Sequence, residues 1–193
     1  MTQNRNDHLE PVEGVFSIYN YQFEYYYKIR KILFDGLTEH PEIRFQVLPS
    51  FTPEAVLDIE FDKRNKKYYM VYHICEGMIW YNEQWENTKV EKFKTGIDKE
   101  SVDLIKSLFD TAVMQVKFSE KGTHGLDGTD YYFSVNKYGL ESGTVWSPSA
   151  GTRMNKLVNL GYKLIELAKS EKEIVKIDEE LQKEMEELID ELK

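Results

Sequence analysis

Cysteine is nearly absent from this chain of 193 residues, in which Cys75 is the only one. A single cysteine excludes an internal disulfide scaffold and a zinc site built from several thiolates. No stretch approaches the roughly 18 to 20 apolar residues that a membrane-spanning helix needs. Residues 1–14 are polar and lack the cationic start and apolar core of a signal peptide. We therefore expect a cytoplasmic protein without a membrane partner, although a signal peptide already removed would leave no trace here.

Basic residues are in deficit, with 25 Lys and Arg against 34 Asp and Glu and a formal net charge of −9. Nonspecific nucleic-acid binding needs a positive surface, so we expect no nucleic acid among the partners. The deficit is local, because residues 171–193 hold ten acids and four lysines and so carry −6 of the total. Changes in composition and charge along the sequence divide the chain into a loose arm (1–14), a single domain (15–170) and an acidic amphipathic helix (171–193). We expect this helix to dock on the domain or on a partner.

Sequence motifs for nucleotide binding and catalysis are also missing. The chain has no G-x-x-x-x-G-K loop, no G-x-G-x-x-G, no H-E-x-x-H and no G-x-S-x-G. His73 and Cys75 share one side of a predicted strand, but side chains two residues apart on a strand are about 6–7 Å apart, too far for direct proton transfer. We expect a buried thiol there, no cofactor and no metal site, and we favour a protein that is not an enzyme.

The spacing of apolar residues predicts a mixture of helices and strands. Helical periodicity covers about 17–34, 98–112, 147–168 and 178–192. Alternation with a period of two covers about 43–48, 55–61 and 130–136, and further strands are predicted at about 68–75, 89–94 and 143–146. Asp98 and Ser147 are predicted helix caps, the latter because Pro148 suits a first helical position. Short turns imply antiparallel neighbours. The predicted fold class is α+β: an antiparallel sheet of five to seven strands, a meander plus a hairpin, with helices packed on one face.

The loop of residues 122–130 is the first candidate site. Its glycines let the backbone approach a ligand, and His124, Asp127 and Asp130 can act as base, orienting group or metal ligand. The same composition suits an ordinary surface turn, which is the interpretation we favour.

Aromatic residues provide the other candidates, because six Tyr and Phe side chains lie between Tyr19 and Tyr27. They fill a core or form a stripe that binds a ligand. Exposed Trp and Tyr are common interface anchors. We expect Trp80 in the core and select Trp85, Tyr25 and Tyr132 as candidate binding residues.

One block of the chain resembles a family. Residues 126–133 (L-D-G-T-D-Y-Y-F), followed by residues 143–148 (G-T-V-W-S-P), resemble small uncharacterised bacterial α+β proteins in which D-G-T-x-Y-x-F leads to W-S-P and a helix. The resemblance covers residues 126–168. It implies a bacterial source, a turn, a hairpin and a capped helix, and it implies no activity.

The function that these observations favour is a noncatalytic protein-binding or interaction module of a bacterial cell. An acidic surface can recognise a basic protein partner, and the C-terminal helix offers a route to a homo-oligomer. The alternative is a hydrolase that uses His124, Asp127 and Asp130 in loop 122–130, with or without a metal ion. A third interpretation, a carrier of a small ligand held between the N-terminal helix and the sheet, requires an enclosed apolar cavity.

Overall fold

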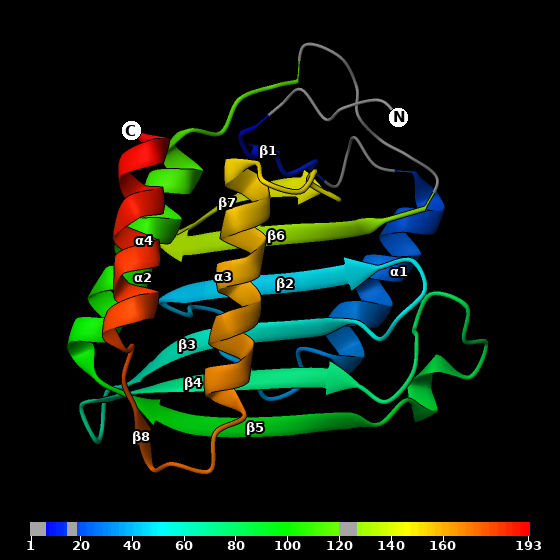
Figure 1. Ribbon diagram of the computed structural model, residues 1–193. Coiled ribbons are helices and arrows are strands. Elements are labelled where there is room, and N and C mark those ends of the chain that lie inside the picture. Colours follow the sequence, from blue (N-terminus) through cyan, green and yellow to red (C-terminus); the bar gives the residue numbers. More distant parts are fainter. Residues whose placement is uncertain (1–6, 15–18, 120–126) are drawn as a thin grey trace.

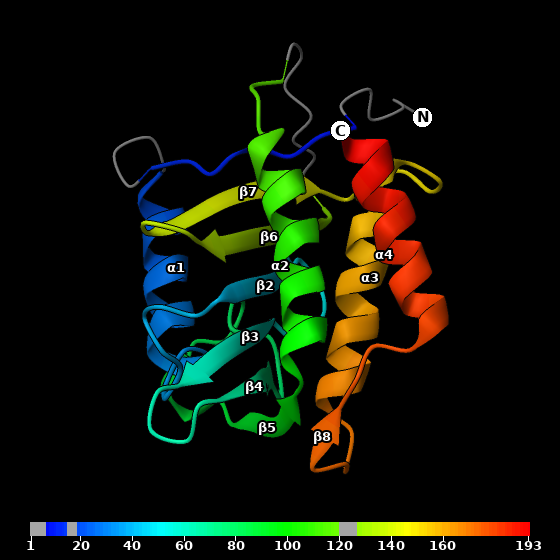
Figure 2. The same ribbon diagram turned by 90° about the vertical axis from the view of Figure 1, so that its left-hand side faces the viewer.

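An antiparallel sheet forms the middle layer of the protein, with helices on both of its faces (Figure 1, Figure 2). The structure, a computed structural model, describes residues 7–14, 19–119 and 127–193. Within these residues the strands are β1 (Glu10–Pro11), β2 (Ile43–Pro49), β3 (Ala55–Asp62), β4 (Lys67–Cys75), β5 (Val90–Ile97), β6 (Thr129–Asn136), β7 (Leu140–Trp146) and β8 (Ile174–Val175). The helices are α1 (Asn20–Ile32), α2 (Lys99–Met114), α3 (Arg153–Ala168) and α4 (Glu179–Leu192), with a short 3-10 turn, η1 (Trp85–Asn87).

The strand order is β1-β7-β6-β2-β3-β4-β5-β8. Strands β2 to β5 form the predicted meander, the hairpin β6–β7 pairs with β2, and only β8 runs parallel to its neighbour, β5. This confirms the α+β class and the mainly antiparallel sheet. The described residues make eight strands instead of five to seven, because β1 and β8 are two residues long and too short to show a periodic pattern.

Helices α2 and α3 lie directly on one face of the sheet. Asp98 caps α2 as predicted, since its carboxylate accepts a hydrogen bond from the Ser101 N–H at 3.1 Å. Helix α3 comes close to the sheet at Gly161, which lies over the buried ring of Phe45 in β2. Helix α4 packs against α2 and α3 on their outer side (Figure 2).

Helix α1 lies on the opposite face, so the expectation that helices pack on one face is wrong. Its buried stripe of Tyr25, Ile29 and Leu33 belongs to a second core cluster with Val56 and Cys75, separate from the main core. Central strands β2 and β3 are buried on both faces. A strand buried on both faces needs apolar cover on each side, and α1 supplies the cover on the face opposite α2 and α3.

The start of α3 also differs from the prediction. The helix begins at Arg153, and its cap is Thr152, whose hydroxyl accepts from the Asn155 N–H at 3.2 Å. Ser147 instead takes a positive φ of 37°, and its hydroxyl accepts a hydrogen bond from the Thr129 N–H at 2.9 Å. Ser147 therefore extends the pairing of β6 and β7 at the end of the hairpin away from its turn, and it does not cap a helix.

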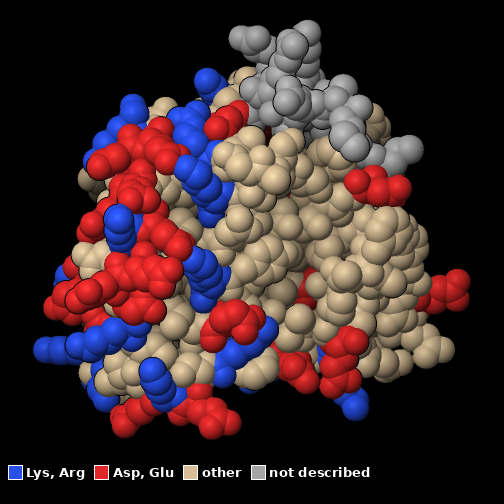
Figure 3. All heavy atoms as spheres, viewed as in Figure 1, with Lys and Arg blue, Asp and Glu red and all other residues tan. Residues whose placement is uncertain are grey.

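The acidic helix α4 packs within the chain. Leu181, Met185, Leu188, Ile189 and Leu192 are buried in the main core. Lysines of α3 pair with its outer acids, as in the Lys156–Glu191 and Lys163–Glu184 ion pairs. Figure 3 shows charged side chains crowding this side of the molecule, while much of the remaining surface in view is uncharged. In the part of the chain that the structure describes, no helix has the length and apolar character to cross a membrane.

Candidate functional site

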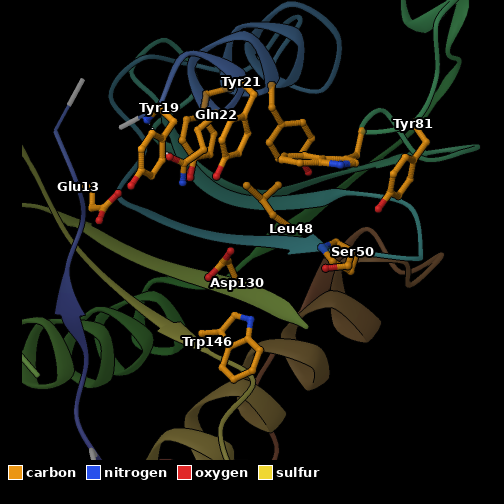
Figure 4. Close-up of a pocket in the computed structure, with 13 residues that line it drawn as sticks. Glu13, Tyr19, Tyr21, Gln22, Leu48, Ser50, Tyr81, Asp130 and Trp146 are labelled. Atoms are coloured by element: carbon orange, nitrogen blue, oxygen red, sulfur yellow. Dashed lines mark hydrogen bonds between the residues drawn. The ribbon is translucent and has the colours of Figure 1, made fainter. Parts of the chain in front are cut away.

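A cavity of about 490 Å³ lies between α1 and the ends of β2, β6 and β7 (Figure 4). We call it the aromatic pocket, because seven of its thirteen lining residues are Tyr or Trp. The lining residues are Glu13, Tyr19, Tyr21, Gln22, Tyr25, Tyr26, Leu48, Pro49, Ser50, Trp80, Tyr81, Asp130 and Trp146. Its rim is open to solvent, since Tyr19, Tyr21 and Tyr81 are 70%, 57% and 62% exposed.

The floor of the pocket follows from strand register. Leu48 of β2 pairs with Asp130 of β6, which pairs with Trp146 of β7, so the three residues form one row across the sheet. Alternate residues of a strand point to opposite faces, so Phe133 of β6 faces the main core while Asp130 faces α1. In Figure 4, Tyr19, Tyr21 and Gln22 extend from α1 towards β2, with Asp130 and Trp146 facing them.

The aromatic wall is organised around Trp80, in the turn after β4. The ring of Trp80 meets the ring of Tyr25 edge-on, with 4.4 Å between their centroids. It makes similar contacts with Tyr21 at 6.1 Å and Tyr81 at 6.5 Å. Trp80 is 38% exposed, so the assignment of this residue to the core is wrong. Tyr21, Trp80 and Tyr81 all line the pocket and are partly exposed, so part of each ring is accessible to a ligand.

Glu54 holds two walls of the aromatic pocket together. Its carboxylate is fully buried and accepts a hydrogen bond from the Tyr25 hydroxyl at 3.0 Å. It also accepts from the Ile79 N–H at 2.9 Å and from the Trp80 N–H at 3.3 Å. A buried carboxylate satisfied by several donors fixes the geometry of the groups around it. Glu54 therefore ties α1 to the turn that carries Trp80 and Tyr81.

A second cavity of about 520 Å³, the polar pocket, adjoins the first and shares Glu13, Gln22, Tyr26 and Asp130 with it. Its floor is two further rows of paired residues on β2, β6 and β7: Gln46, Tyr132 and Thr144, and then Arg44, Ser134 and Ser142. We call the two pockets together the α1 groove.

The Tyr26 and Tyr132 hydroxyls meet at 3.0 Å where the two pockets join. Burial raises the pKa of both phenols, and the nearby charges of Asp130 and Glu13 raise it further. In Tyr26 the hydrogen bond from Tyr132 opposes this rise without cancelling it. Both hydroxyls therefore keep their protons at neutral pH and serve as hydrogen-bonding groups.

Arg44 forms part of the polar pocket, but its charge is already compensated. Its guanidinium donates to both carboxylate oxygens of the buried Asp58, at 2.7 and 2.6 Å, and lies over the ring of Phe34. Burial raises the pKa of Asp58 to about 6, against the opposing effect of Arg44. The bidentate contact fixes both side chains in place.

The candidate residues that the sequence predicts lie at several separate places in the structure. Tyr25 and Asp130 line the aromatic pocket, and Tyr132 lines the polar pocket. Trp85 lies in η1 beside Tyr27, outside the groove. Asp127 is exposed and lines neither pocket, and His124 lies outside the described residues. Asp130 therefore lines both pockets, and Asp127 does not join it there.

His73 and Cys75 are buried, and neither lines the groove. The Nδ1 atom of His73 is 2.8 Å from the Leu33 carbonyl oxygen, which anchors the end of α1 to β4. Burial lowers the pKa of His73, with a further contribution from Lys92. Burial raises the pKa of the Cys75 thiol to about 12, so the thiol stays protonated.

Across the described ranges, no three His, Cys, Asp or Glu side chains come together as a metal site would require. In comparisons with known proteins, no family model, curated protein or solved structure matches the chain. The resemblance of residues 126–168 to small bacterial proteins stays a prediction.

Proposed function

We propose that this protein is a noncatalytic interaction protein that binds an extended segment of another protein in the α1 groove. The observation that carries the proposal is the groove itself: two adjoining pockets with an exposed aromatic rim at one end. Exposed Tyr and Trp beside a concave surface are typical of protein interfaces. Each pocket alone has the volume of a small-ligand site, and two in succession suit a chain that continues from one to the next.

The chemistry of the lining favours binding over catalysis. Among the described residues, no His or Cys lines either pocket. The Tyr26 and Tyr132 hydroxyls are paired and hold their protons, and the guanidinium of Arg44 is engaged by Asp58. The small-ligand carrier is less well supported, because the aromatic pocket is open and acidic instead of enclosed and apolar. The hydrolase alternative depends on His124, outside the described residues, and we do not propose it.

The proposal includes a cytoplasmic location in a bacterial cell. The unpaired, buried Cys75 fits a reducing compartment, and the sequence resemblance supports a bacterial source. The acidic balance supports a protein partner over nucleic acid.

A displayed library of random twelve-residue peptides tests the proposal. Peptides selected on the wild-type protein would then be measured against Gln46→Trp, which fills the middle of the groove floor. The matched control is Gln182→Trp, an exposed position on α4. We expect the selected peptides to bind the control as they bind the wild type, and to bind the groove variant at least about tenfold more weakly. Failure to select any peptide, or equal binding to all three proteins, would contradict the proposal.

A further inference from the structure

We infer that the aromatic pocket receives the positively charged side chain of a lysine or arginine in the bound segment. This inference rests on the proposed function and specifies the chemistry of its ligand at one end of the α1 groove. The aromatic pocket combines aromatic faces with two carboxylates, and each feature favours a cation.

The aromatic side of the pocket suits a cation because the faces of Trp and Tyr rings are negative. A cation within about 6 Å of such a ring centroid is attracted to its face. Trp80 packs edge-on with Tyr21 and Tyr25, at interplanar angles of 82° and 72°, and all three residues line the aromatic pocket. The protein already uses this contact elsewhere, since Lys94 lies 4.4 Å from the ring centroid of Tyr69. The rings of Trp80 and Tyr21 are the exposed members of this group, so they are the ones that a ligand cation in the pocket can contact.

The opposite side of the pocket supplies negative charge. Figure 4 shows Asp130 on the floor facing Tyr19 and Tyr21, with Glu13 at one end. The two carboxylates act over the pocket, since both contribute to the raised pKa of Tyr26 after the larger effect of burial. Within the described parts of the chain, no Lys or Arg lines the aromatic pocket.

Other ligand side chains fit this lining less well. An acidic side chain would be repelled by Glu13 and Asp130. An apolar side chain would gain nothing from the negative charge of Glu13 and Asp130. Ammonium and guanidinium groups provide both positive charge and N–H donors, and charge-assisted hydrogen bonds to a carboxylate are about twice as strong as neutral ones.

The three tryptophans provide a direct test by NMR. Trp80 and Trp146 line the aromatic pocket, while Trp85 lies outside it and serves as an internal control. The probes are capped five-residue peptides with lysine, arginine, norleucine or glutamate between alanines. We expect the lysine peptide, the arginine peptide or both to shift the indole N–H signals of Trp80 and Trp146 saturably, without shifting that of Trp85. The norleucine and glutamate peptides should have little effect. Increasing salt should weaken binding.

A charge-neutralising variant tests the role of the carboxylates. Asp130→Asn should weaken binding of the basic peptide about tenfold, the size expected for one charge-assisted hydrogen bond. Its matched control is Glu83→Gln, which removes the same charge from an exposed position outside the pocket. The spectrum of each variant also reports whether it is folded.

Three results would overturn the inference: equal binding of the norleucine peptide, no shift with either basic peptide, or unchanged binding to Asp130→Asn. If the library-selected peptides still bound in the groove, the proposed function would stand although no lysine or arginine side chain enters the aromatic pocket. If those peptides also failed to depend on Gln46, the proposed function would fall as well.

Discussion

Replacement of Gly161 by alanine should destabilise the protein, because α3 lies against β2 at this position without room for a side chain. A Cβ atom at position 161 would be 2.5 Å from Cε1 and 2.6 Å from Cζ of Phe45, where ordinary contact begins near 3.4 Å. Helix and ring would have to separate by nearly 1 Å. Phe45 has little freedom to yield, since it is fully buried and in contact with the rings of Tyr131, Phe133 and Tyr162.

The expected change follows from two opposing effects. Overpacking a well-filled core costs about 1–3 kcal/mol, and the confined position of Phe45 indicates the upper half of that range. Alanine recovers about 1 kcal/mol, because glycine is a poor helix former. We therefore expect Gly161→Ala to lower the free energy of unfolding by about 1–2 kcal/mol.

Urea unfolding followed by circular dichroism would measure this loss. Gly77→Ala is the control, because a Cβ there would meet no atom within 4 Å. Combining Gly161→Ala with Phe45→Leu makes a double-mutant cycle, in which the smaller side chain should relieve the contact and give a favourable coupling of about 1 kcal/mol or more. The reasoning is refuted if Gly161→Ala is as stable as the wild type, or if the two substitutions are additive.

Three further predictions concern the groove and its support. In Gly128→Ala the new Cβ would be 2.4 Å from Nε1 of Trp146 and 2.6 Å from Oγ of Ser147, so we expect the indole signal of Trp146 to move, peptide binding to weaken and the free energy of unfolding to fall. Removing one partner of the buried Arg44–Asp58 pair by Arg44→Met should cost about 3–5 kcal/mol of unfolding free energy, and adding Asp58→Leu should restore most of it; equal instability of the double variant would contradict this. Burial lowers the pKa of His73 below the usual 6.5, so the unfolded chain is protonated first and the stability that the neutral ring provides is present above about pH 6.5 and lost as the pH falls. Urea unfolding at pH 7.5 and 5.5 should therefore show a smaller loss on acidification in His73→Gln than in the wild type.

The sequence predicts the start of a helix correctly where the capping side chain bonds to an N–H group a few residues further along the chain. Asp98 and Asp178 both lie at predicted helix starts, and their carboxylates accept the N–H groups of Ser101 and Leu181. The prediction was wrong at Ser147, because its hydroxyl bonds to Thr129, a partner that the hairpin brings near. A serine before a proline suits both a helix cap and the end of a hairpin strand. The two roles differ only in the hydrogen-bond partner, which for Ser147 is the distant residue Thr129.

The groove was harder to predict because it depends on register. The sequence shows polar or mixed residues alternating with apolar ones on β2, β6 and β7, which indicates a sheet face outside the main core. It does not show that Leu48, Asp130 and Trp146 form one row, because a shift of one residue would send each side chain to the opposite face. Local aromatic density makes Tyr25 a candidate, whereas the exposure of Trp80 depends on how α1 packs beside it and has no local signal in the sequence.

The two shortest strands limit how another protein can approach. β1 occupies part of the outer edge of β7, and β8 occupies part of the outer edge of β5. The rest of β5 carries Glu91, Lys92 and Lys94, and charged residues on an edge strand discourage pairing with another chain. Most of the β5 edge lies beyond the two residues that β8 pairs with, so the charged side chains of β5 are what discourages another strand from extending the sheet there. Recognition by this fold should therefore depend on side chains over a sheet face, which can distinguish one partner sequence from another. Backbone pairing at a sheet edge is largely independent of the partner's sequence.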